Sequence, residues 1–200
     1  MNKPEYSSAL KKTPFTYLIS KKIGKLIDSG MIYADIYKKC FDENYICIDS
    51  LQRRREITNV VYERLIGIDP SLLQSFVSAS IASSKFILAY AIAKNDKLFF
   101  EFLLTYYREA LIGEKHYISI SDFDDFFSSI KEKNIYVSKW TKRTLNQLAR
   151  GYRNVLVESG LGTRNKKNIF VNRVIVNPSI VKRIEEIGDK VYLQALLGVK

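Results

Sequence analysis

The sequence has few of the residues that build metal and nucleotide sites. It contains one histidine, His116, and two cysteines, Cys40 and Cys47, which have no partner histidines at zinc-ligand spacing. Neither G-x-x-x-x-G-K-S/T nor G-x-G-x-x-G occurs, so no segment is predicted to cradle nucleotide phosphates. The acidic cluster at residues 122–125 fits the first turn of a helix, where negative charge opposes the helix dipole. We therefore expect no metal, no cofactor and no enzymatic activity.

Long apolar runs are missing as well. The most membrane-like window, Phe76–Ala93, contains Lys85 and several serines and is shorter than the roughly 20 apolar residues of a membrane span. The opening MNKPEYSSALKK has no apolar region of the kind found in secretory signals. We expect a cytoplasmic protein with reduced thiols that does not enter the membrane.

Positive charge is plentiful but unevenly distributed. The formal net charge is +11, of which residues 138–200 carry +9, with 13 basic and 4 acidic residues. Residues 1–70 have a net charge of +3 and residues 71–137 of −1. This asymmetry indicates a basic module joined to a nearly neutral body, and a basic module favours a polyanionic partner.

Hydrophobic content of 46% supports a substantial core, and the apolar periodicity predicts a mainly α fold. We expect a flexible arm over 1–14, a helical N-terminal lobe over 15–115 and a basic, winged-helix-like lobe over 116–200. Pro70 is expected in a first helical turn, and Ser121 with Asp124 is expected to form a capping box. The only β structure is expected to be a hairpin around Leu161–Val176. Helices are predicted at about 15–28, 31–43, 50–68, 71–93 with a break near 78–80, 98–112, 122–133, 140–159 and 178–197.

The segment 138–176 contains the strongest functional signal, because its predicted helix separates polar from apolar residues. One face carries Leu145, Leu148, Tyr152, Val155 and Leu156, and the opposite face is basic and polar. Arginine, asparagine and glutamine form bidentate hydrogen bonds to base edges, and lysine and arginine neutralise phosphates. The candidate DNA contacts on this helix, the hairpin tip and the strand are Lys139, Lys142, Arg143, Asn146, Gln147, Arg150, Arg153, Asn154, Arg164, Lys166, Lys167 and Arg173.

A second basic cluster, Arg53-Arg54-Arg55, opens the helix predicted at 50–68. It fits a phosphate clamp, a protein-docking patch, or a solvated helix start with Arg54 packed inward. We include Arg53 and Arg55 among the candidate DNA contacts.

Several landmarks resemble the BrxA family of BREX phage-defence systems along nearly the whole chain. They are YSSALKKTPFTYLISKKIGKLIDSG, RRREITNVVYERLIGID, KLFFEFLLTYYREAL, SDFDDFF and WTKRTLNQLARGYRNVLVESGL, in this order. The resemblance implies a cytoplasmic, non-enzymatic DNA-binding protein with winged-helix character and a NusB-like helical lobe. It also implies that the protein works together with the methyltransferase, ATPase and phosphatase-like components of the same defence system.

Three functions remain open from the residues. The leading hypothesis is double-stranded DNA binding through the basic helix and hairpin tip. The alternatives are an RNA-binding, antitermination-like factor that uses the helical body, and an adaptor whose basic surface docks an acidic protein.

Overall fold

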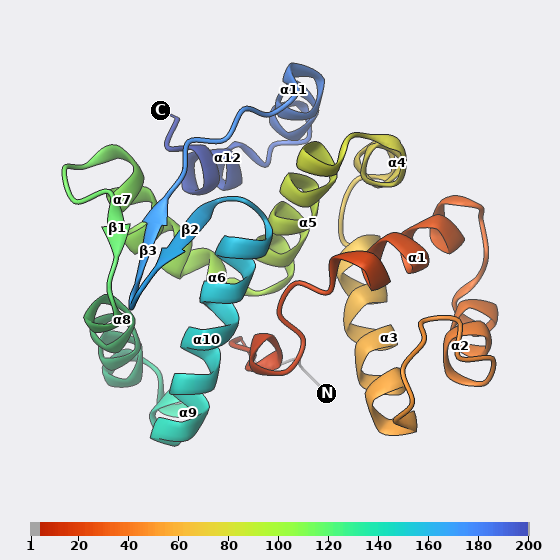
Figure 1. Ribbon diagram of the computed structural model, residues 1–200, viewed down its shortest axis with the longest axis horizontal. Coiled ribbons are helices and arrows are strands. Elements are labelled where there is room, and N and C mark those ends of the chain that lie inside the picture. The colour runs from red at the N-terminus through yellow and green to blue at the C-terminus, as the bar shows by residue number, and fades with distance from the viewer. Residues whose placement is uncertain (1–4, 200) are drawn as a thin grey trace.

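Helix α5 (Ile81–Asn95) runs through the middle of the protein, and most other helices pack around it (Figure 1). The computed structural model describes residues 5–199. Every residue from Phe86 to Ala93 is buried, as the predominantly apolar sequence of this stretch predicted. Its packing partners include α3 (Leu51–Ile66), α4 (Pro70–Ser78), α10 (Lys142–Glu158) and α12 (Lys190–Leu197).

The predicted mainly α class is confirmed, with one small antiparallel sheet. Two short helical elements differ from ordinary α-helix: η1 is a 3-10 turn, and η2 is a π-helical turn between α6 and α7. The remaining elements are η1 (Ala9–Lys11), α1 (Tyr17–Asp28), α2 (Tyr33–Phe41), α6 (Lys97–Phe102), η2 (Leu103–Tyr107), α7 (Arg108–Ile112), α8 (Ile120–Lys133), α9 (Ile135–Ser138) and α11 (Pro178–Glu186).

Side-chain caps set most of the helix starts. Pro70 is the first residue of α4, and the predicted break near 78–80 is confirmed because α4 ends at Ser78 and Ser80 caps α5. The predicted Ser121–Asp124 capping box was wrong: the box is Ser119 with Asp122, two residues earlier.

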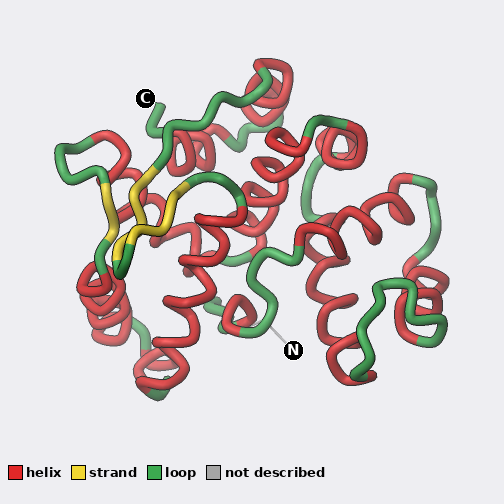
Figure 2. The backbone as a smooth tube through the Cα atoms, in the orientation of Figure 1, coloured by secondary structure: helices red, strands yellow, loops and turns green. Residues whose placement is uncertain are grey.

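The sheet has the order β1-β3-β2, and both pairings are antiparallel (Figure 2). The hairpin β2 (Gly162–Asn165) and β3 (Asn168–Val171) lies inside the predicted region. The expectation that β structure is confined to 161–176 was wrong, because β1 (Tyr117–Ile118) pairs with β3 from outside it. The strand also ends at Val171 rather than near Val176, because the ladder partners of β3 end there.

The N-terminal segment differs from the flexible arm expected over 1–14. Residues 1–4 lie outside the described residues, but Tyr6, Leu10 and Thr13 are buried. Leu10 belongs to η1, which packs against α10. A Cβ built at Gly151 of α10 would lie 2.2 Å from the Leu10 carbonyl oxygen. Arg64 of α3 donates to the carbonyl oxygens of Thr13 and Pro14 at 2.5 and 3.1 Å. The segment therefore bridges α3 and α10.

Buried residues form one continuous cluster that crosses the predicted lobe boundary at 115/116. Tyr152 of α10 packs edge-on against Phe99 of α6, with ring centroids 4.8 Å apart, and contacts Phe127 of α8 at 5.8 Å. The division into two lobes stays a prediction.

Candidate nucleic-acid interface

Helix α10 is held firmly by its apolar face. Leu148, Tyr152, Val155 and Leu156 are fully buried, as the periodicity predicted. Thr141 caps the helix by accepting a hydrogen bond from the Thr144 N–H at 3.2 Å. This anchoring fixes the direction in which the opposite face points.

The opposite face of α10 is exposed and basic. Its candidate residues follow the spacing i, i+3, i+4 and i+7, so they share one side of the helix over two turns. The exposed candidates on and just before α10 are Lys139, Lys142, Arg143, Asn146, Gln147 and Arg150.

The β2–β3 hairpin is tied back onto the second half of α10. Arg153 Nη2 donates to the Lys167 carbonyl oxygen at 3.1 Å, and Arg164 Nη2 donates to Asn154 Oδ1 at 3.3 Å. The structure therefore brings five candidate residues together: Arg153, Asn154, Arg164, Lys166 and Lys167. Lys166 and Lys167 are exposed at the tip, where Lys166 adopts a positive φ of 50°.

Like charges crowd this surface. The pKa of Arg153 is lowered, first by its partial burial and then by the charges of Arg164 and Arg150. Among residues 5–199, no carboxylate lies within ion-pair distance of any of the nine basic residues between 138 and 173. Glu158, the one acid of that stretch, ends the helix beside Lys85. The positive charge of this surface is not neutralised by neighbouring carboxylates, and it therefore favours an anionic ligand.

Arg173 lies apart from the hairpin tip. It is exposed, but it follows the end of β3 at Val171, whereas Lys167 precedes the first residue of that strand. The sequence analysis missed three residues that line a hollow at the tip together with the two lysines: Asn165, Asn168 and Phe170. Their only signal in the sequence is their position beside the lysines.

The arginines of α3 have mostly structural contacts. Arg54 donates to the carbonyl oxygens of Phe41, Ile48 and Asp49, which matches the inward-packed alternative for this residue. Arg53 pairs with Glu56 at 3.0 Å and donates to the Lys12 carbonyl oxygen at 2.9 Å. Arg55 is exposed. Helix α3 lies on the other side of the N-terminal segment from α10 (Figure 1), so Arg53 and Arg55 do not join the α10 surface.

Two further observations concern metal binding and membrane insertion. Within residues 5–199, no three histidine, cysteine, aspartate or glutamate side chains gather closely enough to hold a metal ion. Asp122 instead accepts hydrogen bonds from the Ser119 N–H and from Lys115 Nζ, at 2.6 and 2.7 Å. None of the described helices is long and apolar enough to span a membrane.

Comparison with known proteins identifies relatives over almost the full length. The BrxA family profile matches residues 4–188. A curated protein from Bacillus cereus (strain H3081.97), described as BREX protein BrxA, is 30% identical over 193 residues, which cover 96% of each chain. The crystal structure of an uncharacterized protein from Magnetospirillum magneticum has a TM-score of 0.84, covering 98% of this chain and 100% of that one. At 20% identity, this second likeness concerns the fold alone.

Proposed function

Because the chain belongs to the BrxA family of BREX phage-defence systems, we propose that it is a non-enzymatic component that binds double-stranded DNA. In this proposal α10 enters the major groove and the β2–β3 hairpin contacts the sugar-phosphate backbone. The protein works in the cytoplasm beside the methyltransferase, ATPase and phosphatase-like components of the system.

The order of elements supports the proposal. β1, α8, the short helix α9, α10 and the β2–β3 hairpin follow one another along the chain, and a sheet order of β1-β3-β2 is typical of a winged helix. In helix-turn-helix proteins the second helix of the pair lies in the major groove. Here that position belongs to α10, and the hairpin is the wing.

The dimensions also agree. Arg143 and Arg150 are seven residues apart, which corresponds to about 10 Å along a helix at 1.5 Å per residue. Both side chains therefore lie on one face of the helix, two turns apart, and a major groove about 12 Å wide admits such a helix. The single observation that carries the proposal is the crowding of Arg150, Arg153 and Arg164 without a neutralising carboxylate.

Binding assays on duplex DNA, duplex RNA and single strands test this function. We expect Arg143→Glu with Arg150→Glu to abolish most duplex DNA binding and to leave the fold intact, because both side chains are exposed. Arg55→Glu is the matched control, since Arg55 is exposed on α3, and it should leave DNA binding unchanged. If about five phosphates are neutralised, log K against log salt has a slope of roughly −4 to −5.

Other outcomes point to other functions. Preference for RNA over DNA would replace the proposal with the RNA-binding alternative. Binding to no nucleic acid, with retained pull-down of the other BREX proteins, would replace it with an adaptor role.

A further inference from the structure

Helices α2 and α3 form a pocket with aromatic walls, separate from the basic surface. It has a volume of about 380 Å³ and is lined by Tyr33, Asn59, Tyr62 and Glu63. The two rings are 4.7 Å apart between centroids and tilted by 50°. The Tyr33 hydroxyl donates to Asn59 Oδ1 at 2.8 Å, which fixes a ring that is still 41% exposed.

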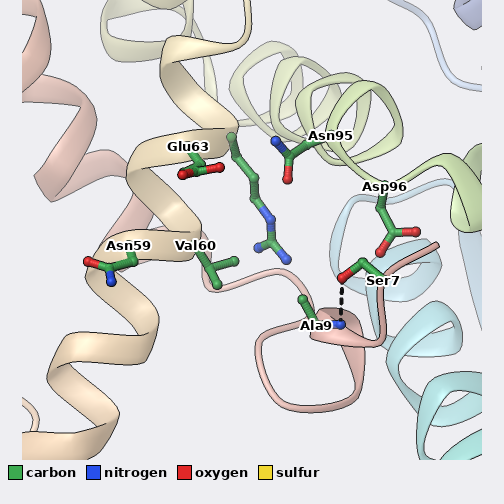
Figure 3. A pocket seen from close by; sticks show the side chains of 8 residues that line it. Ser7, Ala9, Asn59, Val60, Glu63, Asn95 and Asp96 are labelled. Carbon is green, nitrogen blue, oxygen red and sulfur yellow. Dashed lines mark hydrogen bonds between the residues drawn. The ribbon is translucent and has the colours of Figure 1, made fainter. Parts of the chain in front are cut away.

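A second pocket of about 230 Å³ adjoins the first, because both are lined by Asn59 and Glu63. Figure 3 shows Asn95 and Asp96 across this pocket from the α3 residues, with Ser7 and Ala9 of the N-terminal segment nearby. Asp96 is only 5% exposed, and its carboxylate accepts a hydrogen bond from the Phe99 N–H at 3.0 Å. We refer to these two adjoining pockets, which extend from the tyrosines to the buried Asp96 carboxylate, as the groove.

The charges along this groove favour a cation. Among the residues that the structure describes, Glu63 is the only charged one that lines the aromatic pocket, and it helps burial to raise the pKa of Tyr33. Glu63 has other interactions of its own, but a carboxylate has about four acceptor positions and serves several donors. Arg64 also lines the inner pocket, where its charge partly offsets that of Asp96, and its guanidinium donates to the Thr13 and Pro14 carbonyl oxygens. Arg55 affects Tyr33 electrostatically without lining either pocket.

We propose that the groove from Tyr33 and Tyr62 to Asp96 receives an arginine side chain of a partner protein. A planar guanidinium stacks on tyrosine faces and donates to carboxylates, and arginine is a frequent anchor of protein interfaces. Ile32, the residue before α2, and Ile66, the last residue of α3, are exposed and supply apolar surface around such an anchor. A nucleobase also stacks on tyrosine, but its phosphate would be repelled by Glu63.

The test is an NMR titration of the full chain, with labelled tyrosine rings, using N-acetylarginine amide as the probe. N-acetylcitrulline amide has nearly the same shape without the charge. We expect the arginine probe to shift the Tyr33 and Tyr62 signals and to bind about two- to thirtyfold more tightly than the citrulline probe. Glu63→Gln should remove most of this preference, and Tyr33→Leu should weaken binding of the arginine probe.

Both substituted side chains are exposed and neither belongs to α10, so an unchanged helical circular-dichroism spectrum serves as the check that each variant is folded. Equal binding of the two probes, no effect of Glu63→Gln, or no shift at all would overturn the proposal. A stronger response of the same tyrosines to adenosine monophosphate would also overturn it, and would assign the groove to nucleotide bases. These outcomes do not depend on whether α10 binds DNA.

Discussion

Replacing Gly151 by alanine tests the contact between the N-terminal segment and the proposed recognition helix. A Cβ at this position would lie 2.2 Å from the Leu10 carbonyl oxygen and 2.8 Å from its carbon, both of which are backbone atoms. Glycine is otherwise unfavourable inside a helix, and alanine there gains about 1 kcal/mol. The prediction therefore depends on which of two opposing effects is larger.

The steric effect should be larger. The carbonyl cannot rotate away, because the segment around it is held by Arg64 at Thr13 and Pro14 and by the buried Leu10 side chain. Strained packing typically costs about 1–3 kcal/mol, and exposing a leucine costs about 1.5–3 kcal/mol. After subtracting the helix gain of about 1 kcal/mol from either cost, we expect Gly151→Ala to lower the free energy of unfolding by up to about 2 kcal/mol.

Equilibrium urea unfolding of the wild type, Gly151→Ala and Gly24→Ala measures this difference. Gly24 is the matched control, since a Cβ there meets the ring of Phe76, a side chain that can shift, at 3.0 Å. Its change should stay within about 1 kcal/mol of zero. If Gly151→Ala instead raises the free energy of unfolding by about 1 kcal/mol, η1 does not pack closely on α10.

Three further results are expected. Lys166→Glu with Lys167→Glu should weaken binding to all duplexes by a similar factor in competition assays, because phosphate contacts carry no base information; a change confined to one sequence would contradict this. Burial raises the pKa of Asp96 to about 6, so its stabilising contribution is complete below about pH 4 and is lost as pH rises through 6. The free energy of unfolding of the wild type, relative to Asp96→Asn, should therefore fall by about 2 kcal/mol between pH 4 and 7, and a constant difference would refute the assignment. Hydrogen bonds from Arg183 and Ser71 hold the pKa of Asp69 well below its usual range, so Asp69→Asn should lower the melting temperature at pH 7, and the difference should shrink as pH falls below about 4.

The elements that could be predicted correctly from the sequence are those with a long and regular apolar pattern. Of the five residues predicted on the apolar face of α10, Leu148, Tyr152, Val155 and Leu156 are fully buried, and Leu145 is partly buried against the core. β1 was missed because two residues, Tyr117 and Ile118, show no alternation and form a strand only through β3. β-branched residues continue past Val171 as Val174, Ile175 and Val176, but among the described residues β3 has no ladder partners there.

The capping error has a similarly local cause. Ser119 with Asp122 and Ser121 with Asp124 both fit the S-x-x-D pattern, and the apolar residues that follow suit either start. Lys115 Nζ lies 2.7 Å from the Asp122 carboxylate, a contact that the helical pattern does not reveal. The choice between two equivalent local motifs thus depended on residues outside the motif.

Composition identified the basic residues of the candidate site, but their tertiary contacts decide which of them are available to bind a ligand. Arg53 and Arg143 are equivalent by charge and by their place near a helix start, yet Arg53 already binds Glu56 and a backbone carbonyl oxygen while Arg143 is exposed. Forming a new phosphate contact at Arg53 would first require breaking these bonds, whereas Arg143 exchanges only water. For the same reason Arg53→Glu is a poor control for DNA binding, because it introduces a carboxylate opposite Glu56 and perturbs the start of α3. A loss of binding in that variant would therefore not locate the DNA surface, and Arg55→Glu separates the two helices more cleanly.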